Sequence, residues 1–222
     1  DILLFRSYDH IIFRVFPNLF THIGLVFVPS EDLILEKGVV LEKNITYVVE
    51  VTVQEMSRPS YPFPHTRKNG FFATPISHMI NDYPGEIFVR SVQSPVSNSR
   101  LARFVQEQKD AIFDPVVFLY TDIWLLFVLT VSTASNEVAP FLKYLLPTRR
   151  GFTCSEFAAS ALSYIGVLNV SEKASRLWTP MCFSTGQNLL EKYGKVPWTA
   201  ETRLLLSIDS GLTTRKKSCF LD

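Results

Sequence analysis

Four short apolar segments lie close together near the start of the chain, and they constrain its fold more than any other feature. They span residues 1–6, 22–28, 33–36 and 47–53, with turn-forming or polar residues between them. Short apolar runs between turns are typical of strands. Because strands this close in sequence are joined by short connections, they pair most readily in antiparallel order. This part of the chain is therefore predicted to form an antiparallel sheet.

Helical patterns follow in the second half of the chain. Apolar residues recur at helical spacing over residues 97–112, and Ser97 or Asn98 is a suitable N-cap for this helix. A second helix is expected to open at residues 153–154 and to end near Ile165, just before a glycine. These helices are expected to pack against the sheet.

Proline-rich and apolar stretches complete the pattern. Residues 57–85 carry several prolines, which exclude a continuous helix and predict a loop-rich segment. Further strands are expected at 85–92 and 203–208, and two helices are expected within 116–147. Strands first, helices later and a returning strand predict an α+β fold in a single domain spanning residues 1–222.

The most apolar run and the charge balance limit the classes of partner. Residues 116–132 fall short of the about 20 apolar residues of a membrane-spanning helix and include Asp122. They are predicted to form a buried helix within an apolar insertion at about 115–150. The formal net charge of +1 gives no indication of a nucleic acid partner. The basic cluster 215–217 is expected to be solvated, with contact to a membrane surface left open as an alternative.

The three cysteines, Cys154, Cys182 and Cys219, are widely spaced and form no Cys-x-x-Cys pair. This spacing excludes a zinc knuckle and a dense disulfide framework. We expect no metal site and no organic cofactor. Free thiols favour a cytoplasmic or other reducing compartment.

Cys154 is the candidate nucleophile, because it stands where the second predicted helix begins, in the sequence GFTCSEFAA. At a helix N-terminus the unpaired backbone N–H groups and the helix dipole favour a thiolate over a thiol. The same N–H groups can face the oxyanion that forms when a carbonyl is attacked. The alternative is a buried cysteine that only packs.

His22 and Glu50 are the candidate partners of this thiol. His22 opens a predicted strand, and an imidazole held on a strand is well placed to act as a general base. Glu50 lies between β-branched neighbours in another strand, where a carboxylate is costly to bury unless it is paired. If the two strands adjoin, Glu50 can accept the second ring N–H of His22 and support the imidazolium. The alternatives are a core or surface histidine and an outward-facing glutamate.

In this order, the segments resemble the permuted branch of the NlpC/P60 superfamily of papain-like proteins, in which the His strand precedes the Cys helix. Residues 21–26, THIGLV, resemble the family's S-H-x-G-(I/L)-V strand. Residues 47–50, YVVE, resemble the next strand, which ends in an acidic residue, and residues 152–157, FTCSEF, resemble the (Y/F)-x-C-S-E-(L/F) start of the Cys helix. Residues 1–6 resemble the opening strand, without the glycine that usually precedes it. YiiX-like and poxvirus-like members share these motifs most closely.

The resemblance implies a circularly permuted papain-like fold and a cysteine amidase or thiol peptidase with Cys154, His22 and Glu50 as its triad. Such a hydrolase forms a thioacyl-enzyme from the amide, ester or thioester bond of a small peptide, amide or lipid-like substrate. Two alternatives stay open. One is a lipid-directed acyltransferase of the same superfamily, although the Asn-Cys-Glu-His-Phe setting of those enzymes is not present around Cys154. The other is a non-catalytic module that binds a fatty acyl chain or a peptide.

Overall fold

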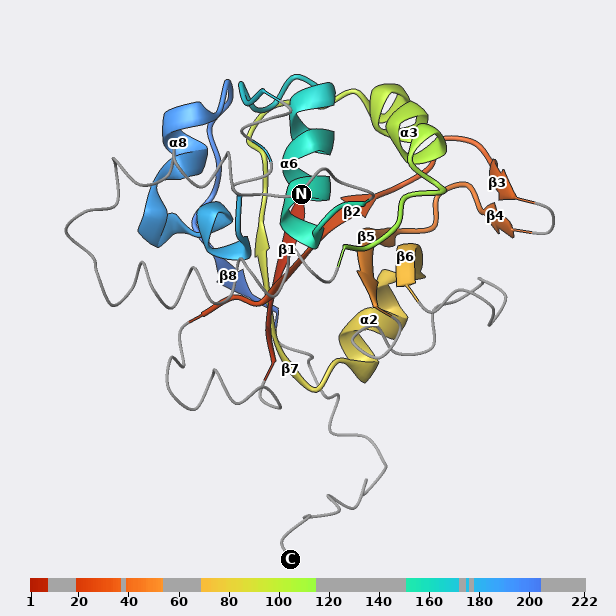
Figure 1. Ribbon diagram of the computed structural model, residues 1–222, viewed down its shortest axis with the longest axis horizontal. Helices are drawn as coiled ribbons and strands as arrows, with labels where there is room; N and C mark the ends of the chain where they lie inside the picture. Colours follow the sequence, from red (N-terminus) through yellow and green to blue (C-terminus); the bar gives the residue numbers. More distant parts are fainter. Residues whose placement is uncertain are drawn as a thin grey trace, which may run out of the picture.

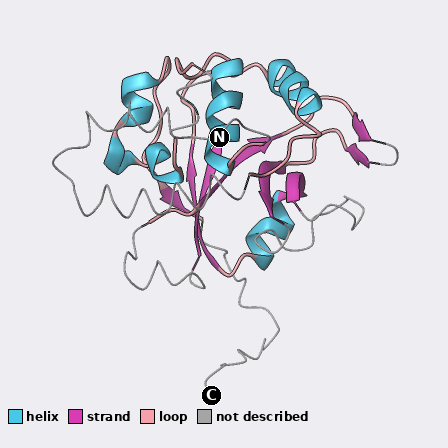
Figure 2. Ribbon diagram, in the orientation of Figure 1, coloured by secondary structure: helices cyan, strands magenta, loops and turns pink. Residues whose placement is uncertain are grey.

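The computed structural model describes residues 1–7, 19–36, 39–53, 69–114, 151–171, 175 and 178–204. The described part of the chain is a mixed α+β structure in which a six-stranded antiparallel sheet packs against a few helices (Figures 1 and 2). The predicted α+β class is therefore confirmed at this level.

The sheet has the strand order β6-β5-β2-β1-β7-β8, and each of its neighbouring pairs is antiparallel. Its strands are β1 (Ile2–Ser7), β2 (His22–Phe27), β5 (Tyr47–Val53), β6 (Asn69–Pro75), β7 (Gly85–Arg90) and β8 (Thr202–Arg203). A separate two-stranded sheet is formed by β3 (Leu33–Glu36) and β4 (Val39–Leu41).

Helices cover both faces of the large sheet (Figure 1). They are α2 (Ile76–Asp82), α3 (Asn98–Glu107), α6 (Cys154–Tyr164) and α8 (Leu189–Tyr193), together with the 3-10 helices η1 (Pro180–Phe183) and η2 (Thr185–Gln187). No helix among the described residues is long and apolar enough to cross a membrane.

Alternation along the strands divides the core into two apolar layers, because successive side chains of a strand point to opposite faces. In β1, Ile2 and Leu4 belong to the larger layer, which also contains Cys154 and Phe157 of α6. Leu3 and Phe5 belong to the smaller layer, which packs against α2. Helix α6 therefore brings Cys154 onto the face of the sheet that carries most of the core.

The strands predicted near the start of the chain and at 85–92 are confirmed to within two residues. The helix predicted over 97–112 is also confirmed, with Ser97 as its N-cap, but it ends at Glu107. The helix from Cys154 is confirmed and is followed by Gly166, which has a φ of 84° as a glycine C′ residue should.

One prediction was wrong, and two others fall largely or wholly on residues that the structure does not describe. Residues 57–85 were expected to be loop-rich, but they contain strand β6 and helix α2. Pro75 is the last residue of the strand and the N-cap of the helix, so it marks the junction of the two elements without disrupting either.

The helices expected within 116–147 lie outside the described residues. Of the last predicted strand, the structure describes 203–204, of which Arg203 lies in β8.

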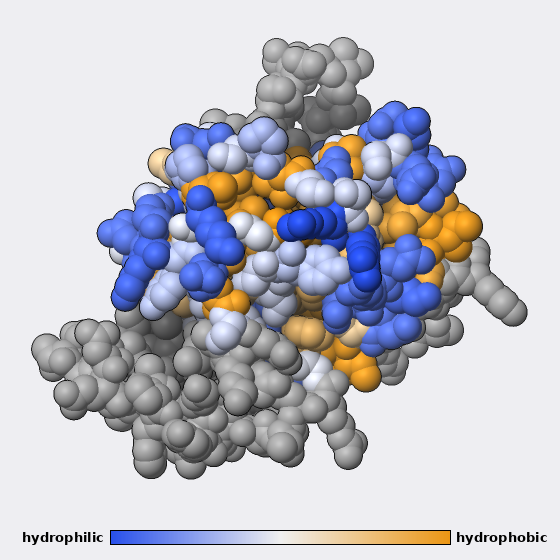
Figure 3. All heavy atoms as spheres, turned by 90° about the horizontal axis from the view of Figure 1, so that it is seen from above, coloured by the Kyte–Doolittle hydropathy of each residue, from blue (hydrophilic) through white to orange (hydrophobic). Residues whose placement is uncertain are grey.

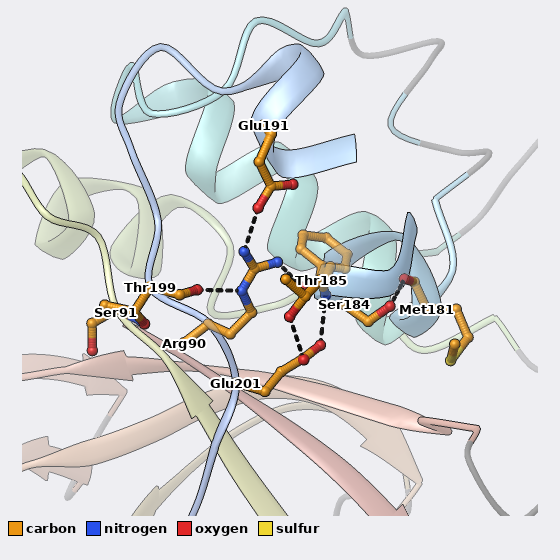
Figure 4. Close-up of polar contacts among 9 residues, drawn as sticks. Arg90, Ser91, Met181, Ser184, Thr185, Glu191, Thr199 and Glu201 are labelled. Carbon is orange, nitrogen blue, oxygen red and sulfur yellow. Dashed lines mark hydrogen bonds and ion pairs between the residues drawn. The ribbon is translucent and has the colours of Figure 1, made fainter. Parts of the chain in front are cut away.

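A fully buried arginine joins the C-terminal part of the chain to the sheet. Arg90, the last residue of β7, donates from Nε to the carbonyl oxygen of Thr199 and from Nη1 to that of Phe183, both at 2.8 Å. Its Nη2 donates to Oε1 of Glu191 on α8 at 2.6 Å. Figure 4 shows Thr199 and Glu191 on different sides of the Arg90 guanidinium group. The three directions of donation hold η1, α8 and the segment before β8 in one arrangement.

Apolar side chains also reach the surface of the described part. Seen from above, this surface is largely hydrophilic, with apolar residues between the polar ones (Figure 3). Ile34 on the β3–β4 hairpin is 64% exposed, and Ile112 is 52% exposed. Ile34 lies on the separate small sheet, away from the strands that carry His22 and Glu50.

Candidate active site

Cys154 is the first residue of α6, and local hydrogen bonds explain why the helix begins there. The hydroxyl of Thr153, the N-cap, accepts a hydrogen bond from the backbone N–H of Glu156 at 3.2 Å. The hydroxyl of Ser155 donates to the carbonyl oxygen of Trp178 at 2.6 Å. These contacts fix the first turn of the helix, and Cys154 is left 2% exposed within it.

The segment that leads into Cys154 is held against the chain that precedes the apolar insertion. Phe152 donates its N–H to the carbonyl oxygen of Ile112 at 2.8 Å, and its own carbonyl accepts from the N–H of Asp114 at 2.9 Å. A Cβ atom on Gly151 would lie 2.3 Å from the oxygen of Ile112, so only glycine permits this approach. The position of the thiol thus depends on a close contact just before the helix.

His22 is the first residue of β2 and lies opposite Phe5 of β1 in the antiparallel register. The centres of the two rings are 5.3 Å apart. The paired part of the β2–β5 ladder runs from Leu25 opposite Val49 to Phe27 opposite Tyr47, so His22 lies beyond it. The imidazole is 15% exposed, which makes it the more accessible member of its pair with Glu50.

Glu50 of β5 is 1% exposed, and its Oε2 lies 2.5 Å from Nε2 of His22. Gly24 of β2 lies next to this carboxylate. A Cβ atom at Gly24 would lie 2.4 Å from Cγ1 of Val48, and 3.6 Å, an ordinary contact distance, from Oε2 of Glu50. Glycine at this position therefore gives room to the side chain of Val48, the neighbour of Glu50 on the same face of β5.

The three side chains act on one another, because the Cys154 sulfur and the Glu50 carboxylate both interact with the His22 imidazole. Nε2 is taken by Glu50, so Nδ1 is the ring nitrogen left for the thiol. Burial of the imidazole disfavours its charged form, but the neighbouring Glu50 carboxylate and the Cys154 sulfur outweigh burial and raise the pKa of His22 to about 10. The arrangement can hold a proton on His22 beside a sulfur nucleophile at neutral pH.

Because the pKa of His22 is raised in the folded protein, the free energy of unfolding is expected to depend on pH. A group whose pKa is higher in the folded protein stabilises the fold fully below its unfolded pKa, here 6.5, and loses this effect as pH rises through about 10. The difference in free energy of unfolding between the wild type and His22→Gln should therefore be greatest near pH 6 and shrink up to about pH 10. Chemical denaturation at a series of pH values measures this difference. A difference that stays constant over the same interval would contradict the charged pairing.

The structure brings together all three residues that the sequence singled out, although they come from three separate elements. Gly24 and Thr153 support the site and were not assigned roles from the sequence, although Gly24 stands in the motif around His22. The remaining histidines do not join the site in the described residues: His78 lies exposed on α2, and His10 and His65 lie outside the described residues.

The other cysteines differ from Cys154. Cys182 in η1 accepts a hydrogen bond from the backbone N–H of Thr179 at 3.3 Å, and burial raises the pKa of its thiol. Cys219 lies outside the described residues. The part of the chain that the structure describes has no cluster of three or more His, Cys, Asp or Glu residues able to hold a metal ion.

A surface pocket of about 310 Å³ lies apart from these residues. It is formed between the turn that follows β2 and helix α3, with Glu31, Arg103 and Gln106 among its lining residues. Cys154, His22 and Glu50 do not line it. The pocket therefore belongs to a different part of the surface.

The chain matches no protein-family model, no curated protein and no solved structure. The chemistry of the site is therefore inferred from its residues and their contacts.

Proposed function

We propose that the protein is a cysteine hydrolase that cleaves an amide, ester or thioester bond through a thioacyl-enzyme. The observation that carries the proposal is the pair of contacts made by His22, to Cys154 on one side and to Glu50 on the other. A nucleophile, a base and a group that orients the base are the parts that covalent catalysis of this kind requires.

The proposed reaction begins from the ion pair of the Cys154 thiolate and the His22 imidazolium, because His22 already holds its proton at neutral pH. The thiolate attacks the carbonyl carbon, and the carbonyl oxygen becomes an oxyanion near the N–H groups of the first turn of α6. His22 then returns the proton to the leaving amine, alcohol or thiol, and the bond to the leaving group breaks. Water, deprotonated by His22, attacks the thioester and releases the acid and the Cys154 thiolate, which restores the ion pair. Glu50 supports the imidazolium in both halves of the reaction.

The order of the elements supports a permuted papain-like fold of the NlpC/P60 type as the finer description. The His strand β2 comes first, the Glu strand β5 second and the Cys helix α6 last in the chain. The residues of the motifs lie at the corresponding places: His22 opens its strand, and Cys154 opens its helix.

The convergence of three buried or nearly buried side chains favours a catalytic site over a module that only binds. A binding module has no need of a glutamate held at 2.5 Å from an imidazole that also contacts a thiol.

The acyltransferase alternative shares the same acyl-enzyme and differs in the molecule that takes the acyl group from Cys154, which is not water. The features that favour it from the sequence lie in the apolar insertion, outside the described residues.

The proposal is tested by the rate at which iodoacetamide alkylates each cysteine at neutral pH, followed by mass spectrometry of the peptides. Cys154 is expected to react at least about tenfold faster than Cys182, because only Cys154 has an imidazolium partner at a helix N-terminus. His22→Ala should remove this advantage while Cys182 keeps its own rate.

The control for this experiment is His78→Ala, which removes an exposed histidine of α2 outside the site. It should leave the rate at Cys154 unchanged. If Cys154 reacts no faster than Cys182 in the wild type, or if His22→Ala has no effect on it, the activated thiol and the proposed hydrolase are both wrong.

A further inference from the structure

A cluster of two arginines, one glutamate and two aromatic rings lies on the side of the sheet that carries Cys154, and it takes no part in the reaction described above. Arg6 of β1 donates from Nη1 to Oε2 of Glu86 on β7 at 2.9 Å. Arg203 of β8 lies with its Nη1 2.9 Å from the other oxygen, Oε1, of the same carboxylate. Two guanidinium groups thus share one carboxylate, and the cluster keeps a net positive charge.

The guanidinium of Arg6 is held in place by aromatic rings. Its Cζ atom lies 4.8 Å from the centre of the Phe88 ring and 5.1 Å from the centre of the Phe20 ring. The two rings are themselves 5.3 Å apart in an edge-to-face arrangement. A guanidinium fixed by ring contacts keeps its planar set of donors in one orientation, which suits recognition of a carboxylate or phosphate.

The hydrogen-bonding capacity of Arg6 is only partly used. Among the described residues, Glu86 is its one hydrogen-bond acceptor, and its Nε atom is buried without a partner. A buried guanidinium N–H without an acceptor is costly, and an anionic ligand would satisfy it. Arg203, at 52% exposed, leaves further donors facing solvent beside it.

The cluster lies on the same face of the sheet as the thiol. Because successive side chains of a strand alternate, Arg6 shares the face of Ile2 and Leu4, which α6 covers, and not the face of Phe5 and His22. Phe20 and Phe88 belong to or pack against the same apolar layer as Cys154. Phe20 also donates its N–H to Sδ of Met181, close in the chain to Trp178, whose carbonyl oxygen accepts from Ser155 next to Cys154. The cluster and the thiol are therefore on one side of the sheet and are linked by these contacts.

We propose that Arg6, supported by Arg203 and held by Phe20 and Phe88, binds an anionic group, carboxylate or phosphate, of the substrate that reacts at Cys154. This inference rests on the proposed hydrolase and adds to it the substrate class: a molecule with a negative charge a few bonds from the scissile carbonyl. Neutral amides and esters are then poorer substrates than their anionic counterparts.

The test compares matched alkylating probes that carry an iodoacetyl group. N-iodoacetylglycine and N-iodoacetyl-phosphoethanolamine are the anionic probes, and N-iodoacetylglycinamide is the neutral one. In each case the Cys154 sulfur forms a bond to the methylene carbon as iodide leaves. The wild type is expected to react about tenfold faster with an anionic probe than with the neutral probe, the factor that a weaker charge-assisted hydrogen bond contributes. A preference for the carboxylate probe indicates a peptide-like or fatty acid-like substrate, and a preference for the phosphate probe indicates a lipid headgroup.

Arg6→Gln should lower the ratio of the anionic-probe rate to the neutral-probe rate by about tenfold. Any attraction that His22 exerts on the anionic probes is common to all variants and cancels in this comparison. Arg203→Gln changes an exposed side chain and should lower the ratio by about threefold, so it remains informative if Arg6→Gln does not fold. Arg103→Gln, which removes an exposed arginine of α3, is the matched control and should keep the wild-type ratio.

Equal rates with the anionic and neutral probes in the wild type would overturn the anion site while leaving the activated thiol intact. An unchanged ratio in both Arg6→Gln and Arg203→Gln would also overturn it. Failure of the neutral probe to label Cys154 faster than Cys182 is a different result, because it refutes the proposed hydrolase itself.

Discussion

Replacing Cys154 with alanine is expected to abolish turnover of an activated ester or thioester, with a loss in kcat of about four orders of magnitude or more. The reason is that the substitution removes the atom that would carry the acyl group, and water cannot use His22 in the same geometry. Cys154 is buried, with 2% of it exposed, but the change to alanine removes only the sulfur atom. The fold should therefore stay intact. The measurement is steady-state hydrolysis of a p-nitrophenyl ester together with thermal unfolding of the same samples.

Two variants make this result interpretable. Cys182→Ala removes the other described thiol, which burial keeps in its neutral form by raising its pKa, and it should retain wild-type turnover. Glu50→Gln keeps the shape of the buried side chain and removes the charge that supports the imidazolium, so a partial loss of kcat is expected. Cys154→Ala protein that still hydrolyses the ester at the wild-type rate would refute the thioacyl mechanism.

Replacing Arg90 with methionine is expected to lower the free energy of unfolding by about 3 kcal/mol or more. The guanidinium is fully buried and donates to two carbonyl oxygens, of Thr199 and Phe183, which would be left without these donors. Glu191, at 43% exposed, can turn to solvent when its partner is lost, so it adds less to the cost. Chemical denaturation of the purified protein measures the change.

The matched control for Arg90→Met is Arg103→Met on α3. Arg103 also contacts a glutamate, Glu107, at 2.9 Å, but its side chain is 75% exposed. An exposed pair of this kind contributes little, so the control should unfold at nearly the same denaturant concentration as the wild type. If both variants lose the same small amount of stability, the buried arginine does not hold the C-terminal segments in place.

The local parts of the fold and of the site could be predicted from the sequence, because they depend on neighbouring residues. The strand that His22 opens follows from its apolar composition, and the start of α6 follows from the strong helix formers that come after Cys154. The prolines of 57–85 misled the prediction, because proline was read as a breaker although Pro75 stands at the junction of a strand and a helix. The same residue is compatible with both roles, and only the pairing of β6 with β5 decides between them.

The contacts that join distant parts could not be predicted in the same way. The hydrogen bonds of Arg90 reach carbonyl groups 93 and 109 residues further along the chain, and any residue type presents a carbonyl. The Arg6 cluster likewise joins residues of strands β1, β7 and β8, and no single sequence motif predicts that these strands are neighbours in the sheet. Glu50 was the intermediate case: a carboxylate between β-branched residues needs a partner if it is buried, and His22 was its candidate partner only if the two strands adjoin, which the sequence does not show.

The close contact between Gly151–Phe152 and residues 112–114 has a consequence for how this protein can vary. The parallel bridge between Phe113 and Phe152 brings the two ends of the intervening segment to adjacent points on the body of the protein. The entropy lost in closing a loop rises only slowly with its length. Segments of very different length can therefore be accommodated between these ends while Cys154 keeps its position, so the length of this segment can change independently of the residues that contact the thiol.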